Sequence, residues 1–211
     1  GSTDETVEIA ESFGARVVPI RKEDFTFGRS LNVGCAAAHG AVLVFISGHC
    51  IPKDNDWLVK LIDPIAEGKV SYTYGRQIGN GISKYSECQL FNKYFPTESQ
   101  LPQEGFFCNN ANSAISTAVW EEFKFDEELS GLEDMELGKR LVQHGHRLGY
   151  VAEAPVYHIH EESWHNVRVR YEREAIALQK IMPEIQIHFG DFCRYLFSGI
   201  LLDLGNALQE K

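Results

Sequence analysis

Paired cysteines, long apolar runs and low-complexity tracts are all missing from this sequence of 211 residues. The five cysteines are widely spaced and none forms a C-x-x-C pair, and such an odd, scattered set is typical of reduced thiols in the cytosol. No signal peptide is visible, and no run of about 18 apolar residues is present that could span a bilayer. We therefore expect a cytoplasmic protein that contacts a membrane at most peripherally.

Basic residues are scarce relative to acidic ones. Lysine and arginine total 20 against 30 aspartate and glutamate residues, which gives a formal net charge of −10. This charge argues against a nucleic-acid polymer as partner. A small nucleotide stays allowed, because metal ions and helix N-termini hold phosphate groups without a basic surface.

The N-terminal third of the chain alternates between helical and strand patterns. Residues 1–14, 27–40 and 55–65 have helical patterns, whereas residues 15–20 and the continuous apolar run 41–46 have strand patterns. The alternation predicts an α/β domain with a parallel sheet, and the run 41–46 is typical of a strand buried on both faces. Ligands of such sheets gather beyond the carboxyl ends of the strands, and His49 lies just past one of these ends.

The C-terminal part of the chain has a different pattern. Two helices are predicted at residues 163–181 and 191–209, and the second is apolar nearly all round. We predict a main domain over residues 1–162 and a C-terminal helical extension over residues 163–211. The extension is expected to bury its apolar side chains on the domain or in a homo-oligomer. A peripheral membrane contact is the alternative, although basic residues that would attract anionic lipid are sparse there.

Three short groups of polar residues contain side chains that can take part in chemistry. They are Ser47-Gly48-His49 at a strand end, Glu133-Asp134 at a helix start, and His158-x-His160 on a strand. Each also has a purely structural interpretation, because strand ends, first helical turns and strand faces carry such residues without a ligand. Together, histidines from the first and third groups could complete a divalent metal site, with phosphate oxygens and water as further ligands. A nearby carboxylate could act as general base toward an acceptor hydroxyl.

The order of these groups resembles that in glycosyltransferase family 2, close to its rhamnosyltransferase-like branch. The resemblance covers roughly residues 1–182 and rests on "GSTDET", "FTFGRSLNVGCAAAHGAVLVFISGHCIPKDNDWL", "YGRQ", "FCNNANSAISTAVWEEFKFDEEL", "GLEDMELGKRLVQHGHRLGYVAEAPVYHIH" and "RYEREAIA". It implies a GT-A fold, which is an α/β fold with a Rossmann-like, mixed and mainly parallel sheet flanked by helices. The family's usual strand, helix and strand before "GSTD" are lacking, so the resemblance implies an N-terminally truncated domain. Such a chain would be a fragment, a degenerate gene product or a form completed by another chain.

The resemblance also implies an inverting displacement that moves a sugar from a nucleotide-sugar donor to a glycan or lipid-linked acceptor. Asp134 would be the general base, and Glu133 would position that base or the acceptor. Donor contacts would come from Asp4, Arg29, Ser47, Gly48 and His49; acceptor-side contacts from Asn110, Asn112 and Trp164; and metal ligands from His49, His158 and His160. The cation, manganese or magnesium, would stabilise the charge that grows on the departing diphosphate.

The family's metal-binding D-x-D motif is replaced by Ser47-Gly48-His49. Loss of two carboxylates should weaken the binding of magnesium or manganese. Two forms of the site stay open: a metal held partly by His49, or a metal-independent site in which His49 donates to the diphosphate. Two other functions also stay open, namely an inactive or fragmentary nucleotide-sugar-binding domain and a metal hydrolase. The hydrolase is disfavoured by the lack of a compact H-E-x-x-H motif. A lipid-linked acceptor would place the protein at the inner face of the membrane.

Overall fold

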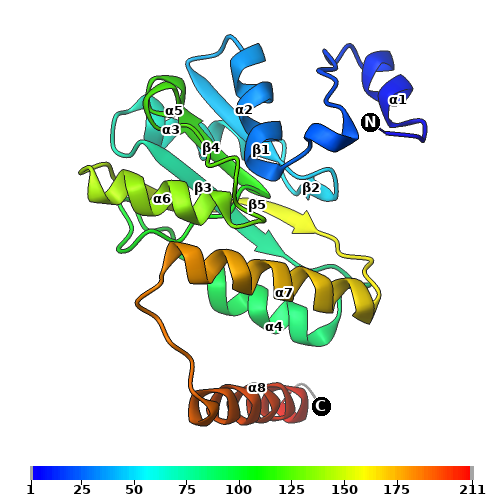
Figure 1. Cartoon of the computed structure of the whole chain (residues 1–211), viewed down its shortest axis with the longest axis vertical. Helices are drawn as coiled ribbons and strands as arrows, with labels where there is room; N and C mark the ends of the chain where they lie inside the picture. Colours follow the sequence, from blue (N-terminus) through cyan, green and yellow to red (C-terminus); the bar gives the residue numbers. More distant parts are fainter. Residues whose placement is uncertain (1, 210–211) are drawn as a thin grey trace.

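A mixed sheet of five strands forms the centre of this computed structural model, which describes residues 2–209 (Figure 1). The strands are β1 (Val42–Ile46), β2 (Cys50–Pro52), β3 (Tyr72–Ile78), β4 (Asn112–Ser116) and β5 (Leu148–His158), in the spatial order β1-β4-β3-β5-β2. β3 and β5 pair in parallel, whereas the other three pairs are antiparallel. The outer ends of the two predicted domains, Gly1 and residues 210–211, lie outside the described residues.

Helices cover both faces of the sheet. They are α1 (Thr6–Ser12), α2 (Phe27–Ala37), α3 (Trp57–Ala66), α4 (Tyr85–Tyr94), α5 (Thr117–Phe123), α6 (Glu133–Gln143), α7 (Trp164–Ile181) and α8 (Phe189–Gln209), with a short 3-10 helix, η1 (Lys22–Asp24). On one face, α3 buries Leu61 and Ile65, which are one turn apart, against Ala114 and Val151 of the sheet. On the other face, α2, α4, α5 and α6 supply the larger, aromatic-rich core. Burial of each large apolar side chain contributes about 1.5–3 kcal/mol.

The predicted α/β architecture with a mixed sheet is confirmed, but the expected parallel majority is wrong, because three of the four strand pairings are antiparallel. The run 41–46 forms β1, as predicted, yet β1 is an edge strand whose side chains alternate between more and less buried. A continuous apolar run does not reveal the direction of a strand's partner. Residues 15–20, inside the described part of the chain, form no strand, because none of the described strands pairs with them.

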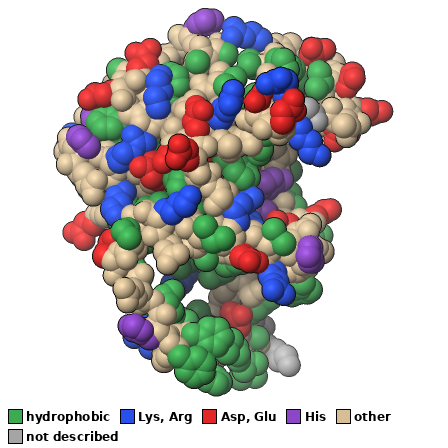
Figure 2. Space-filling model, in the orientation of Figure 1, with side chains coloured by type: hydrophobic (Ala, Val, Ile, Leu, Met, Phe, Trp, Pro, Cys, Tyr) green, Lys and Arg blue, Asp and Glu red, His purple; other side chains and the backbone are tan. Residues whose placement is uncertain are grey.

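The two C-terminal helices differ in how closely they join the sheet-containing part. α7 buries Ala177 and Ile181, whereas α8 lies beside α4 and is tied to it by a hydrogen bond of 2.6 Å from Asn206 Nδ2 to Gln89 Oε1. Large apolar side chains of α8 stay exposed, and Figure 2 shows hydrophobic side chains gathered at that end of the molecule. Among residues 2–209, no helix combines the length and hydropathy that a bilayer crossing needs. The division at residue 163, a homo-oligomer and a membrane contact through these helices stay predictions.

Candidate active site

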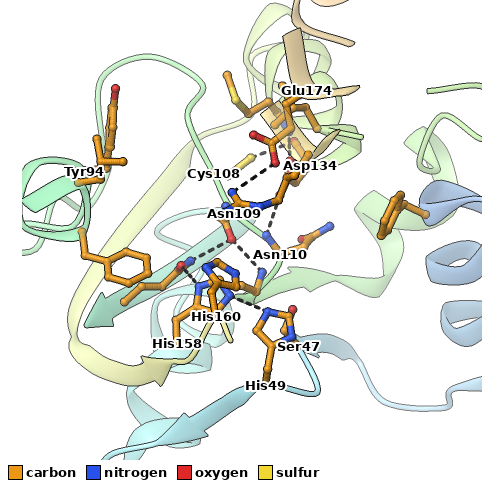
Figure 3. A pocket seen from close by; sticks show the side chains of 18 of the residues that line it. Ser47, His49, Tyr94, Cys108, Asn109, Asn110, Asp134, His158, His160 and Glu174 are labelled. Atoms are coloured by element: carbon orange, nitrogen blue, oxygen red, sulfur yellow. Dashed lines mark hydrogen bonds and ion pairs between the residues drawn. The ribbon is translucent and has the colours of Figure 1, made fainter. Parts of the chain in front are cut away.

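The carboxyl ends of β1, β3 and β5 meet at one edge of the sheet, where a pocket of about 930 Å³ opens. Its lining includes these residues predicted from the sequence: Ser47, His49, Asn110, Glu133, Asp134, His158, His160 and Trp164. They come from the β1–β2 turn, the loop before β4, the start of α6, the end of β5 and the segment into α7 (Figure 3). The volume suits a small organic ligand. The expectation that His49 lies at a ligand-binding strand end is therefore consistent with the pocket.

His49, His158 and His160 form a compact cluster in this pocket. The Nε2 atoms of His49 and His158 are 2.8 Å apart, and one ligand atom from each of the three rings lies within 4.8 Å of the others. The antiparallel pairing of β2 with β5 causes this, because it sets Cys50 opposite His158 and lets Ile159 N–H donate to the His49 carbonyl at 3.1 Å. Both histidines of the H-x-H pair therefore join His49.

The surroundings of His49 and His158 favour their uncharged form. Burial lowers the pKa of His158 to about 3, with further lowering from the neighbouring His160 and His49. Burial likewise lowers the pKa of His49, and His160 adds to the effect. Neutral imidazole is the form that binds a divalent transition metal through a ring nitrogen. The close ring nitrogens of the cluster thus fit a divalent cation.

The acidic pair opens α6 at the other end of the pocket. Leu132 has a left-handed backbone, with φ 58°, just before the helix, and the turn directs Asp134 toward the loop before β4. Asp134 Oδ2 accepts a hydrogen bond from the Asn110 N–H, and Oδ1 accepts one from the Met135 N–H, each at 2.8 Å. Gly138 allows the close packing of α6 on this loop, because a Cβ there would clash with the Phe106 carbonyl. The Asp134 carboxylate is therefore held in one orientation.

Burial raises the pKa of both carboxyl groups, since Glu133 and Asp134 are only 8% and 7% exposed. For Glu133, the charge of Asp134 adds to the effect of burial. For Asp134, the hydrogen bonds from Asn110 and Met135 oppose it. A carboxylate with a raised pKa is better able to accept a proton near neutral pH.

Replacing Glu133 by glutamine should stabilise the fold more at about pH 8 than at about pH 5. A carboxyl group whose pKa is raised in the folded chain contributes its full stability below the unfolded pKa, and that contribution is lost as the pH rises through the folded pKa. Glutamine has no charge to bury and escapes this loss, which we expect to be on the order of 1 kcal/mol. Thermal unfolding of both proteins over this range measures the effect. A difference in melting temperature that shrinks as the pH rises would contradict it.

Four predicted residues lie outside the pocket lining. Asp4 is exposed and accepts hydrogen bonds from the Thr6 N–H and hydroxyl at the start of α1, at 3.2 and 2.6 Å. Arg29 lies 3.9 Å from a carboxylate oxygen of Asp24. Gly48 belongs to the β1–β2 turn but does not line the pocket. Donor contacts from Asp4, Arg29 and Gly48 stay predictions without support from the pocket's lining.

The fourth predicted residue outside the pocket lining is Asn112, whose side-chain amide forms hydrogen bonds inside the fold. It is fully buried, its Oδ1 accepts from Trp57 Nε1 at 2.9 Å, and its Nδ2 donates to the carbonyls of Ala154 and Arg76 at 2.8 and 3.3 Å. These bonds tie β4 to α3, β3 and β5. The predicted acceptor-side contact is therefore wrong for Asn112, because no donor or acceptor of its side chain faces the pocket.

Further residues with functional side chains line the pocket and were not identified from the sequence. Lys84 and Arg170 are the lysine and arginine among the described lining residues, and Gln77, Glu87 and Glu174 also face it. Arg170 is held by Glu162 Oε2 through Nε and Nη2, at 3.0 and 2.9 Å. Arg170 and Glu174 belong to the stretch "RYEREAIA", which was the available signal for them. Gln77 ends the stretch "YGRQ", which was the available signal for it, whereas Glu87 lies in the less regular middle of the chain, which carries no comparable signal.

The sequence of the chain is similar to those of known glycosyltransferases. The model of the family described as "Glycosyl transferase family 2" matches residues 1–123. The chain is 26% identical to the O-antigen chain rhamnosyltransferase RfbN of Salmonella typhimurium, over 98% of this chain and 71% of that protein. Its identity to the O-antigen chain rhamnosyltransferase WbaN of Salmonella anatum is 25%, over 98% and 70% of the two chains.

Among solved structures, the fold resembles that of the mannosyltransferase PcManGT from Pyrobaculum calidifontis, solved in complex with GDP-Man and Mn2+. The TM-score is 0.65 at 14% identity, and the match covers 95% of this chain but only 58% of that one, less than two thirds. This likeness confirms the predicted GT-A fold. The sequence relatives confirm the predicted rhamnosyltransferase-like branch. Since the family model matches more than half of its residues, the chain belongs to glycosyltransferase family 2.

Proposed function

We propose that this protein is an inverting glycosyltransferase that moves a sugar from a nucleotide-sugar donor to a hydroxyl group of a glycan or lipid-linked acceptor. The observation that carries the proposal is the sharing of one pocket by the imidazole cluster and the oriented Asp134 carboxylate. The loop residues Asn109 and Asn110 lie between these two groups (Figure 3). The pocket thus has one end suited to a charged leaving group and another suited to proton uptake.

The donor's diphosphate would lie against the imidazole cluster, near Ser47. His49, His158 and His160 would hold a divalent cation there, which when bound supplies positive charge to the departing diphosphate. Lys84 and Arg170, which also line the pocket, would add fixed positive charge. The relatives named above are rhamnosyltransferases of O-antigen chains, and so we propose a rhamnosyl donor and a bacterial surface glycan as acceptor.

Asp134 would take the proton of the attacking hydroxyl group. The acceptor oxygen then bonds to the anomeric carbon while the bond from that carbon to the diphosphate oxygen breaks, and the electron pair leaves with the diphosphate. A base acts well when its pKa lies near the working pH, and burial raises the pKa of Asp134 in that direction. Glu133 beside it would position the acceptor or the base. Asn110 and Trp164, which is 71% exposed, would contact the acceptor.

A donor panel tests the proposal. The purified chain is incubated with nucleoside-diphosphate sugars, including rhamnosyl donors, with and without divalent cations, and release of nucleoside diphosphate is followed. We expect turnover with at least one donor and its loss on chelation of the cation. Binding of donors without turnover, by calorimetry, would contradict catalysis and favour the inactive nucleotide-sugar-binding domain. A cytoplasmic location at the inner membrane face stays a prediction.

A further inference from the structure

A chain of hydrogen bonds starting at the backbone fixes the proton positions of His158. The Ala111 N–H donates to Asn109 Oδ1 at 3.0 Å, which identifies that atom as the carbonyl oxygen of the side chain. Gln77 therefore presents its NH₂ group to Asn109 Oδ1, at 2.9 Å, and its own Oε1 to His158 Nδ1, at 2.6 Å. Because Gln77 Oε1 can only accept, His158 Nδ1 must carry the proton. When neutral, His158 then has its lone pair on Nε2.

His160 is oriented by a second partner on a different element. Its Nδ1 is hydrogen bonded to Glu87 Oε1 on α4, and because a carboxylate accepts, this nitrogen is also the protonated one. Both side chains are only 15% exposed. The other carboxylate oxygen of Glu87 is buried and has no hydrogen-bond partner among the described atoms. A buried acceptor of this kind is costly unless a ligand or bound water supplies a donor.

We propose that Gln77 and Glu87 are positioning residues, which leave the Nε2 lone pairs of His158 and His160 free for a cation held with His49. The proposal rests on the metal site of the proposed function and adds the class of cation. Three imidazole ligands favour zinc and the later transition metals, whereas magnesium and manganese favour carboxylate oxygens. The cluster should therefore prefer Zn2+ or Co2+ to Mg2+ or Mn2+.

His49 differs from His158 in which ring nitrogen carries the proton. Its Nε2 lies 2.8 Å from His158 Nε2, and a proton must lie between two nitrogens at that distance. Since His158 carries its proton on Nδ1, the shared proton belongs to His49 Nε2 in the metal-free chain. Long-range ¹H–¹⁵N NMR of the metal-free protein should therefore report protonated Nδ1 for His158 and protonated Nε2 for His49. Protonated Nε2 on His158 would overturn the assignment.

Metal titrations test the positioning roles without any measurement of activity. Co2+ and Zn2+ affinities are measured by calorimetry, and the visible absorption of bound Co2+ reports its ligands. We expect Glu87→Ala and Gln77→Met each to weaken binding by about 10–100-fold and to alter the Co2+ spectrum. Glu87→Gln keeps an acceptor for the His160 N–H and should recover much of the loss. The exposed Glu98, outside the pocket lining, gives the control Glu98→Ala, which should bind as the unchanged chain does.

The outcomes separate failure of this inference from failure of the metal site. If the unchanged chain binds neither Zn2+ nor Co2+, the metal site of the proposed function fails, and the inference fails with it. If binding depends on His158 and His160 but the Glu87 and Gln77 variants bind equally well, only the positioning roles are overturned. Tighter binding of Mn2+ than of Zn2+ overturns the assigned class. Should Gln77→Met fail to fold, comparison of Glu87→Ala with Glu87→Gln still tests the positioning role of Glu87.

Discussion

Asp134→Asn should lower kcat by about 10²–10⁴-fold while the protein stays folded, because the asparagine side chain cannot take up the acceptor proton. Asparagine has one side-chain oxygen, which can still accept the hydrogen bond from the Asn110 N–H, so the loop before β4 keeps this contact while the bond from the Met135 N–H is lost. Circular dichroism and donor binding by calorimetry report whether the fold and the pocket survive. The matched control is Asp54→Asn, since Asp54 is exposed and outside the pocket lining.

The pH profile of the unchanged enzyme sharpens this expectation. Catalysis needs the carboxylate form of Asp134, so kcat/KM should rise with pH and level off above the pKa of this group. Burial raises that pKa, and the rise should therefore lie closer to neutrality than the value of about 4 for an ordinary aspartate. Full activity of Asp134→Asn, or an acidic limb unchanged in this variant, would remove Asp134 from the role of base.

Removal of one imidazole from the cluster should have the second large effect. His158→Ala deletes a buried ligand from a set of three, so we expect divalent-cation affinity to fall by at least about 100-fold, with donor affinity falling in parallel. Calorimetric titrations with cation and nucleoside diphosphate measure both. His165→Ala is the matched control, because His165 is exposed on α7 and outside the cluster.

A substitution at His49 tests the same site by changing which cation it prefers. His49→Asp replaces one imidazole of the cluster by a carboxylate, and oxygen ligands favour manganese and magnesium. The ratio of Mn2+ to Zn2+ affinity should therefore increase. If His158→Ala and His49→Asp both leave cation and donor binding unchanged, the imidazole cluster is not the diphosphate site.

The sequence predicts the elements of this fold better than their pairing. The apolar run at 41–46 identifies β1, and the spacing in residues 133–143 identifies α6, because burial of one strand or one helix face leaves a local pattern. The direction of pairing leaves no such pattern. The antiparallel pairing of β2 with β5, which brings His49 to His158, depends on contacts between segments about a hundred residues apart.

The residues of the candidate site could be predicted where they belong to a recognisable sequence motif. Ser47, His49, Asp134 and the H-x-H pair stand in conspicuous positions, and all of them line the pocket. Asn110 and Asn112 were both predicted to contact the acceptor, but sequence spacing cannot tell which asparagine faces the pocket and which one links strands. Asn112 is buried because it begins β4, whereas Asn110 precedes the strand.

The contacts of Gln77 and Glu87 cannot be read from the sequence, although Gln77 belongs to the stretch "YGRQ". A buried glutamine inside β3 and a glutamate in the first turn of α4 look like ordinary strand and helix residues. Their importance arises only when the fold sets them against His158 and His160.

The most direct test is a crystal structure of this chain with Co2+ and a non-hydrolysable nucleoside-diphosphate sugar, in which anomalous diffraction locates the cation. The cation should be bound by His49, His158 and His160, with the diphosphate against it and the anomeric carbon of the sugar facing Asp134. A diphosphate bound away from the imidazole cluster, or a sugar turned away from Asp134, would contradict the proposal that both groups serve one donor.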